Sequence, residues 1–344
     1  MTSSFLKTVP VRQAPGRFSL VPKPYFAVRL IVPWAALCYA VAKLQAEGNA
    51  MYELVQVAAR TYYINSPAKI GVYTPDGRHA LLIDSGNDKD AGRKVLKILA
   101  EKGWSLAAIL NTHSNADHIG GNRYLQAQTG CPIFAPGVEA AFARYPLLES
   151  SLLYGGYPCR ELRHKFLLAQ ESAALPLSDP ACPAALTPIP LPGHFLDMVG
   201  YRTPDDVVFL ADCLSSAATL DKYGVPFLFD AGAYLATLEM VSGMQAALFV
   251  PSHAEATADI APLAAYNRQK LLLSLDVVLG LCQTPATFDD VLQGVFTHYA
   301  LTMTIEQYVL VGSTVRSLLA WLKDEGRVNF SFDNARMYWQ TIPA

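Results

Sequence analysis

Residues 109–122 have the sequence ILNTHSNADHIGGN, in which an apolar strand runs into side chains that commonly bind metal ions. Four candidate ligands follow closely on one another: His113, Asn115, Asp117 and His118. Side chains alternate along a strand, so His113 and Asn115 should point to the same side, while Asp117 and His118 should enter the first turn of a following helix. We therefore expect the four side chains to converge.

Three further ligand-type side chains follow later apolar segments: His194 in Pro-Gly-His, Asp212 after the apolar run 207–211, and His253 in Pro-Ser-His. A single histidine is more often an ordinary surface or capping residue, and one His-x-Asn motif alone is weak evidence. Here, however, ligand-type residues follow several apolar segments, and this recurrence favours a common role. In addition, a charged carboxylate at the end of a buried strand is costly unless it is paired or binds a metal ion. The pattern as a whole favours a metal site.

The series His-x-x-x-Asp-His, Pro-Gly-His, Phe-Leu-Ala-Asp and Ser-His, in this order, resembles the metallo-β-lactamase superfamily across residues 51–268. A match in several parts is far more specific than one short motif. The resemblance implies an α/β (α+β) fold, a four-layer αββα sandwich with a metal site at one edge of its two sheets. It also implies a metal-dependent hydrolase that acts on an ester, thioester, amide or phosphodiester.

The resemblance further assigns ligands to two metal positions that share one carboxylate. The first position takes His113, Asn115 and His194, the second takes Asp117, His118 and His253, and Asp212 bridges them. Asp84, in the segment Leu-Ile-Asp-Ser-Gly, would orient a ligand from behind. The sequence departs from the family motif His-x-His-x-Asp-His at Asn115, whose neutral amide oxygen is a weaker ligand than imidazole.

The implied cofactor is zinc, as one or two ions, with iron or manganese as alternatives. A metal held by histidines and aspartates with an open position lowers the pKa of bound water to about 7 and so supplies hydroxide near neutral pH. The resemblance makes Asp117 the catalytic residue, which would orient this metal-bound hydroxide or accept its proton. The metal would also stabilise the negative charge that develops on the substrate oxygen.

Short apolar segments separated by turn residues predict strands from Met51 onward, and an amphipathic helix is expected over residues 88–102. Strands and helices then alternate, which is typical of a sheet covered by helices. We assign residues 51–268 to the metallo-β-lactamase-like domain.

The pattern after residue 268 changes to helices followed by a hairpin with Asp333 and Asn334 at its tip, so residues 269–344 are predicted to form a winged-helix-like domain. Such modules often bind DNA. From Lys270 onward, however, five Lys and Arg residues face seven Asp and Glu residues, and this balance does not favour contact with phosphates. We interpret the module as packing or dimerisation structure.

Residues 137–178 form a long connection that is rich in tyrosine and basic residues, and long connections in compact domains are frequently functional. Four of these residues are candidates for a substrate wall: Tyr154, Tyr157, Arg160 and Arg163. The arginines would suit a carboxylate or a phosphate. A solvated helix with its basic side chains outward is the alternative.

The composition narrows the partners and the compartment. A net charge of −2 over 344 residues gives no general attraction to nucleic acid or to an anionic membrane. Six cysteines without a Cys-x-x-Cys pair indicate a reducing interior, and we interpret Cys213, next to Asp212, as buried. We expect a cytoplasmic enzyme with a small-molecule substrate and without a nucleic-acid or membrane partner, and a homodimer is one option.

The first fifty residues differ from the rest, with six Lys and Arg residues against one acid, Glu47. The segment from Tyr25 to Ala42 is apolar apart from Arg29 and is at the lower length limit for a membrane span. A signal anchor is one interpretation. We favour a basic and apolar extension over residues 1–50 that is ill-ordered or not native, because Met51 directly precedes the first patterned strand.

Two other functional classes remain open at this stage. One is a non-hydrolytic redox protein, since oxygen-reducing relatives hold two irons on the same scaffold, although they carry a glutamate in the motif. The other is a metal-binding regulator that contacts DNA through its C-terminal module. We rank the hydrolase first, the redox protein second and the regulator third.

Deletion of residues 1–50 should leave a folded and active protein, because the regular pattern starts at Met51. Circular dichroism and activity of the truncated chain, compared with the full chain, test this. Loss of folding on truncation would show that the extension is structural.

Overall fold

Two stacked β-sheets form the centre of the protein in the computed structural model, which describes residues 50–343. The first sheet contains, in spatial order, β1 (Leu54–Gln56), β2 (Thr61–Ile64), β3 (Ile70–Tyr73), β4 (His79–Ile83), β5 (Ser105–Leu110), β6 (Ile133–Ala135) and β7 (Ala174–Pro176). The second contains β11 (Leu248–His253), β10 (Val207–Ser215), β9 (Val199–Arg202) and β8 (Thr187–Pro190). Except for Ala50, the predicted extension 1–50 lies outside the described residues.

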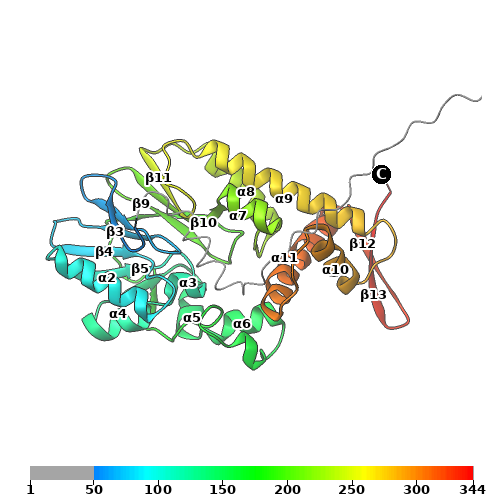
Figure 1. Cartoon of the computed structure of the whole chain (residues 1–344), viewed down its shortest axis with the longest axis horizontal. Coiled ribbons are helices and arrows are strands. Elements are labelled where there is room, and N and C mark those ends of the chain that lie inside the picture. Colours follow the sequence, from blue (N-terminus) through cyan, green and yellow to red (C-terminus); the bar gives the residue numbers. More distant parts are fainter. Residues whose placement is uncertain (1–49, 344) are drawn as a thin grey trace, which may run out of the picture. The chain divides into compact units, whose positions relative to one another are not determined.

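The helices are α2 (Lys89–Glu101), α3 (Ala116–Ile119), α4 (Asn122–Thr129), α5 (Glu139–Arg144), α6 (Leu147–Tyr154), α7 (Ala217–Tyr223), α8 (Ala231–Ser242), α9 (Ala261–Leu281), α10 (Phe288–His298) and α11 (Ile305–Asp324), with a short 3-10 helix at Arg160–Leu162. Figure 1 shows α2 and α4 alongside the first sheet and α8 and α9 beside β10 and β11. The predicted αββα order of layers is confirmed.

Strict alternation on β4 explains why the layers form. Leu81 and Ile83 are buried between the two sheets, whereas Ala80 and Leu82 are buried in the core beneath α2 and α4. A strand that is apolar on both faces is covered on both sides, as expected for the interior of such a sandwich. The strand ends at Ile83, which leaves the next residue, Asp84, at the edge of the sheet.

The helix that follows β4 begins and ends where the sequence predicts. The carboxylate of Asp88 accepts hydrogen bonds from the backbone nitrogens of Asp90 and Ala91, which have no partner within the helix. At the other end, Gly103 has a φ of 69°, a left-handed conformation that stops the helix. Val95 and Leu99 form the buried face of α2.

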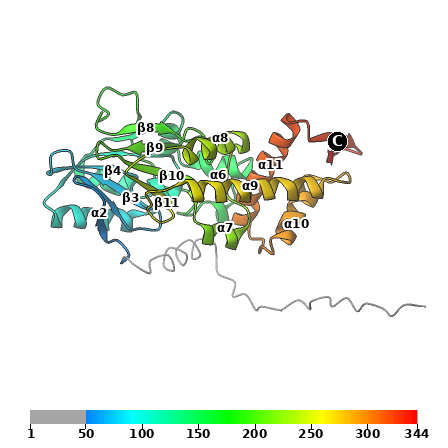
Figure 2. The same cartoon turned by 90° about the horizontal axis from the view of Figure 1, so that it is seen from above.

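The C-terminal helices share one core with the second sheet. Leu210 of β10, Tyr234 of α8, Leu275 of α9 and Val315 of α11 belong to the same buried cluster. Figure 2 shows the long α9 running past α8 towards α10. This helix continues through residues 268 and 269 without a break, so the division into domains at that point stays a prediction.

The C-terminal hairpin is present, and its tip lies one residue later than predicted. It consists of β12 (Val328–Asp333) and β13 (Arg336–Thr341), which pair antiparallel with Asp333 opposite Arg336. Asn334 and the following alanine have positive φ angles of 47° and 59°, which tighten the turn between the strands.

Two smaller findings concern Cys213 and membranes. Cys213 is buried in the core between β10 and the helices, as predicted. Within residues 50–343, no helix combines the length and the apolar character that crossing a membrane requires.

Substitution of Gly71 tests how closely the two sheets pack. A β-carbon on Gly71 would lie 2.8 Å from Cε1 of Phe209 in the opposite sheet and 3.0 Å from Cβ of Ile83. We expect Gly71→Ala to destabilise the protein by about 1–3 kcal/mol, the usual cost of overpacking. The control Gly280→Ala, in α9, meets no atom within 4 Å and should be neutral or stabilise by up to about 1 kcal/mol. Calorimetric unfolding compares them, and equal midpoints would contradict close packing of the sheets.

Candidate metal centre

The structure brings the seven side chains with predicted metal contacts to one edge of the two sheets. They come from the loop after β5 (His113), the start and interior of α3 (Asn115, Asp117, His118), the loop after β8 (His194), the end part of β10 (Asp212) and the end of β11 (His253). Ligand-type atoms of Asp117, His118, Asp212 and His253 all lie within 4.8 Å of one another, and so do those of His113, His194 and Asp212. Asp212 therefore belongs to both groups.

Asp212 joins the two groups through its two carboxylate oxygens. Oδ1 lies 3.1 Å from Nε2 of His118, while Oδ2 lies 3.1 Å from Nε2 of His253 and 3.7 Å from Nε2 of His194. The side chain is only 10% exposed. Burial raises the pKa of Asp212, but His118 and His253 outweigh this effect and hold it well below its usual range. The carboxylate is thus charged and surrounded by imidazoles.

Asp84 orients His118 from behind. It lies directly after β4 with a φ of 64°, a strained conformation for a residue other than glycine. Its carboxylate accepts hydrogen bonds from the backbone nitrogen and hydroxyl of Thr112, at 2.8 and 2.7 Å, and lies 2.8 Å from Nδ1 of His118. Because Nδ1 donates to Asp84, the Nε2 atom of His118 faces Asp212.

His113 provides the clearest test of whether a cation fits. The hydroxyl of Thr112 donates to Asp84, so it accepts at 2.9 Å from Nδ1 of His113. The other ring nitrogen, Nε2, then carries a lone pair; it is fully buried and has no hydrogen-bond partner among the described residues. Burial lowers the pKa of His113 well below its usual value, so the ring is neutral. A buried acceptor of this kind, beside a shared carboxylate, fits a metal ion.

His253 and Asp117 complete the second group on its exposed side. Nδ1 of His253 donates to the backbone oxygen of Pro67 at 3.0 Å, and Nε2 lies 3.3 Å from the carboxylate of Asp117. Although burial opposes it, His118 and His253 lower the pKa of Asp117 to about 2. Burial lowers the pKa of His253, but Asp212 and Asp117 prevail and raise it to about 10. The Asp117 side chain is 40% exposed.

Asn115 lies between the metal groups and a buried glutamate that the sequence analysis did not identify. Its Nδ2 atom donates to Oε1 of Glu149 at 2.7 Å, and its Oδ1 atom lies 3.2 Å from Nε2 of His194. Glu149 is 4% exposed and comes from α6. The sequence holds one signal for it, an acid within the otherwise uncharged and leucine-rich run LLESSLL at 147–153.

Glu139 is a second buried carboxyl group that the sequence analysis missed, and it ties two ligand loops together. It accepts hydrogen bonds from the backbone nitrogen and hydroxyl of Ser114, at 3.1 and 2.5 Å, and from the backbone nitrogen of Asp197 at 2.9 Å. Burial raises the pKa of Glu139 to about 7. The loop of His113 and the loop of His194 are therefore linked through one side chain of α5.

Three glycines allow the backbone around the site to pack closely. A β-carbon on Gly120 or Gly121 would lie 2.3 Å from backbone atoms of Asn87 or Ser85, in the turn after Asp84. Gly193, with a φ of 120°, lies equally close to the backbone of Tyr234. Only residues without a side chain fit here. These glycines thus hold α3 and His194 in place.

Two of the four predicted substrate-wall residues line a hollow that shares no lining residue with the metal groups. Tyr157 and Arg163 line a hollow of about 980 Å³ with Leu147, Leu148 and Ser151 of α6. By helical periodicity, Leu147 and Ser151 lie on the face of α6 opposite Glu149, and Leu148 lies to its side. The remaining two, Tyr154 and Arg160, do not line this hollow, and the Arg160 side chain is 89% exposed. Their role in substrate binding remains a prediction.

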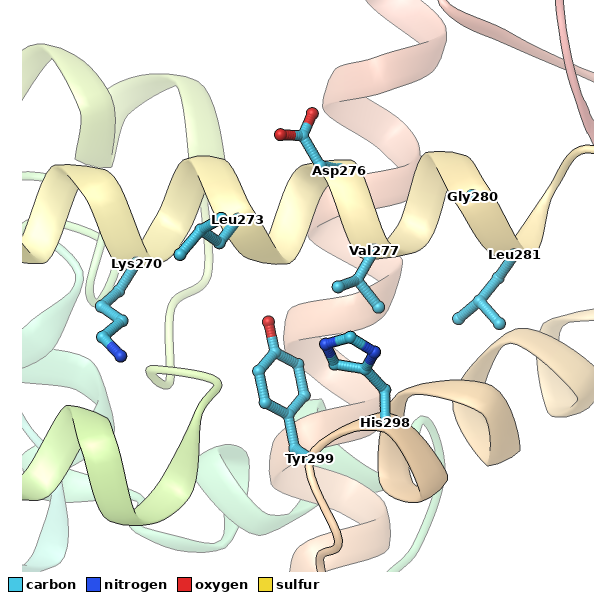
Figure 3. Close-up of a pocket in the computed structure, with 8 residues that line it drawn as sticks. All are labelled: Lys270, Leu273, Asp276, Val277, Gly280, Leu281, His298 and Tyr299. Carbon is cyan, nitrogen blue, oxygen red and sulfur yellow. The ribbon is translucent and has the colours of Figure 1, made fainter. Parts of the chain in front are cut away.

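A second pocket, of about 510 Å³, lies between α9 and the end of α10 (Figure 3). Lys270, Leu273 and Val277 line it from α9, opposite His298 and Tyr299. None of its lining residues belongs to either metal group. This pocket is separate from the candidate centre.

Known proteins share the fold and part of the sequence. A beta-lactamase domain protein from Burkholderia ambifaria has a TM-score of 0.65 at 16% identity, with 86% of this chain and 96% of that chain covered. A metallo-beta-lactamase family protein from Thermus thermophilus has a TM-score of 0.61 at 18% identity, with 80% and 94% covered. At these identities, the likeness concerns the fold alone.

Hydroxyacylglutathione hydrolases of Rhodopseudomonas palustris (strain BisB18) and Methylococcus capsulatus are similar in sequence. They are 33% and 31% identical over 130 and 121 residues, which are 38% and 35% of this chain and 42% and 38% of theirs. The chain thus spans about two fifths of the length of these curated relatives. The model of the metallo-beta-lactamase superfamily matches residues 66–253, more than half of the chain and the whole stretch from His113 to His253. The chain therefore belongs to the metallo-beta-lactamase superfamily.

Proposed function

We propose that this protein is a metal-dependent hydrolase whose substrate is a thioester. The observation that carries the proposal is the pair of ligand groups that share the buried carboxylate of Asp212. The thioester is favoured over an ester, amide or phosphodiester by the names of the relatives, which are hydroxyacylglutathione hydrolases. Zinc is the proposed metal, because two imidazoles and carboxylate oxygens in each group suit it.

The chain's own residues prepare the centre by fixing protons on the outer ring nitrogens. Nδ1 of His194 donates to the backbone oxygen of Phe227 at 3.1 Å, and Nδ1 of His253 donates to Pro67. The Nε2 atoms of both rings therefore point inward. A cation would take the free lone pair of His194 and displace the proton that the raised pKa keeps on His253. A divalent cation held there would polarise a carbonyl oxygen and lower the pKa of a water molecule. Asp117, charged and partly exposed, is placed to accept a hydrogen bond from the attacking water.

The substrate class is tested directly with a panel. Glutathione thioesters, β-lactams, simple esters and phosphodiesters are offered to the purified protein with and without a chelator. We expect chelator-sensitive hydrolysis of the thioester at a higher kcat/KM than of the other classes. Preference for another class would overturn the substrate, and hydrolysis that survives metal removal would overturn the mechanism.

Removal of the shared carboxylate should affect both metal positions. We expect Asp212→Ala to weaken metal binding by at least about 10–100-fold, the loss typical of residues that only support a ligand. Hydrolysis should be almost abolished. Metal content and kcat/KM are compared with those of Asp324→Ala, an exposed carboxylate at the end of α11. Full activity with unchanged metal content in Asp212→Ala would contradict the assignment.

Asn115 should make the first metal position the weaker one. Zinc titration of the metal-free protein should show about one tightly bound ion per chain, held by Asp117, His118, Asp212 and His253, and a second ion only at higher concentration. We expect Asn115→His to strengthen the first position, since Glu149 is placed to accept a hydrogen bond from the new ring. Two equally tight positions in the unmodified protein, or no gain on substitution, would show that Asn115 does not limit binding.

A further inference from the structure

We propose that Glu149 is a positioning residue that turns the side chain of Asn115 into an oxygen ligand of the first metal position. The inference rests on the proposed function, because it requires a metal centre. Glu149 itself touches neither His113 nor His194 by hydrogen bond, and its effect passes through the amide. The first position would then hold two imidazole nitrogens, the Asp212 carboxylate and one amide oxygen.

The hydrogen bonds fix which end of the Asn115 amide faces the centre. The amino group Nδ2 of Asn115 donates to Oε1 of Glu149 at 2.7 Å. The carbonyl oxygen Oδ1 is thereby turned towards Nε2 of His194, at 3.2 Å. Without Glu149, the amide has no such constraint and could present either end.

The atoms that face each other here are both acceptors. Nδ1 of His194 donates to the backbone oxygen of Phe227, which leaves a lone pair on Nε2. Two acceptors at 3.2 Å repel unless a positive charge lies between or beside them. The unpartnered Nε2 of His113 belongs to the same group, with the ring centres of His113 and His194 5.3 Å apart. Three lone pairs and a carboxylate thus converge, as a cation requires.

The contact with Asn115 explains why a carboxylate is buried at this place. Among residues 50–343, the Glu149 side chain has no other hydrogen-bond or ion-pair partner. A carboxyl group that is buried with a single neutral partner is costly, and a cation held on the far side of that partner would lower this cost. The arrangement is therefore expected at a loaded metal centre and is difficult to explain as packing alone.

The helix that carries Glu149 is held in place by the C-terminal helices. Leu153 of α6, one turn after Glu149, packs with Leu162, Leu167 and Val309 of α11. Figure 1 shows α6 next to α11. Glu149 consequently reaches the centre from a braced helix and not from a free loop.

The proposal is tested with zinc titrations of metal-free variants, in which the second position serves as an internal reference. Glu149→Ala should weaken the first position by about 10–100-fold and leave the second almost unchanged. Glu149→Gln should lose less, since its amide oxygen can still accept from Asn115. Ser150→Ala is the control: this neighbour is also buried in α6, but it bonds the backbone oxygens of Leu162 and Leu167.

Two further variants separate positioning from structure. In an Asn115→Ala background, Glu149→Ala should cause no additional loss at the first position. The double variant Asn115→Asp with Glu149→Gln exchanges the two groups, so the amide at position 149 donates a hydrogen bond to a carboxylate at position 115. The contact is kept with its direction reversed, and a charged oxygen faces the metal. This variant should bind the first ion more tightly than the unmodified protein does, and it keeps the proposal testable if Glu149→Ala does not fold.

The outcomes distinguish this inference from the proposed function. Three results would overturn the role of Glu149, provided that the second position still binds zinc. They are unchanged affinity at the first position in Glu149→Ala, an equal loss in the Asn115→Ala background, and weaker binding in the double variant. Failure of both positions in the unmodified protein would overturn the metal centre itself, and the inference with it.

Discussion

The buried carboxylate of Asp212 is the constraint on which the centre depends. A charge on a core strand is tolerated only when charges and hydrogen bonds surround it. Here three imidazoles, from α3, the loop after β8 and the end of β11, face its two oxygens at 3.1–3.7 Å. These three elements belong to the same edge of the two sheets, so the stacking of the sheets is what brings the partners of one carboxylate together.

A second tier of contacts determines which nitrogen of each ring faces inward. Backbone oxygens of Pro67 and Phe227, the Asp84 carboxylate and the Thr112 hydroxyl each hold an Nδ1 atom. Two of these partners are main-chain oxygens, so they do not require a particular side chain at their positions. They explain how rings that are far apart in the chain converge on one centre with their Nε2 atoms directed inward.

The C-terminal helices contribute to the centre without touching it. The hydroxyl of Thr314 in α11 accepts from the backbone nitrogen of Leu228, and that of Ser317 donates to the backbone oxygen of Phe229. The neighbouring residue, Phe227, provides the oxygen that orients His194. The same helix packs against α6, which carries Glu149. Packing of α11 therefore supports two of the groups that shape the first metal position, in agreement with an interpretation of this module as packing structure.

The sequence by itself determined the family, the αββα layers and the identity of the ligand-type residues, because each of these depends on a local pattern. The patterns are alternation in strands such as β4, helix caps such as Asp88, and ligand-type residues that directly follow apolar runs. The sequence also marked Asn115 as the departure. The burial of Glu149 and Glu139 and the hollow that Tyr157 and Arg163 line were decided only by the tertiary structure. Their roles depend on which face of a short helix is buried and on contacts between residues 25 to 58 positions apart, and such contacts leave no periodic signal in the chain.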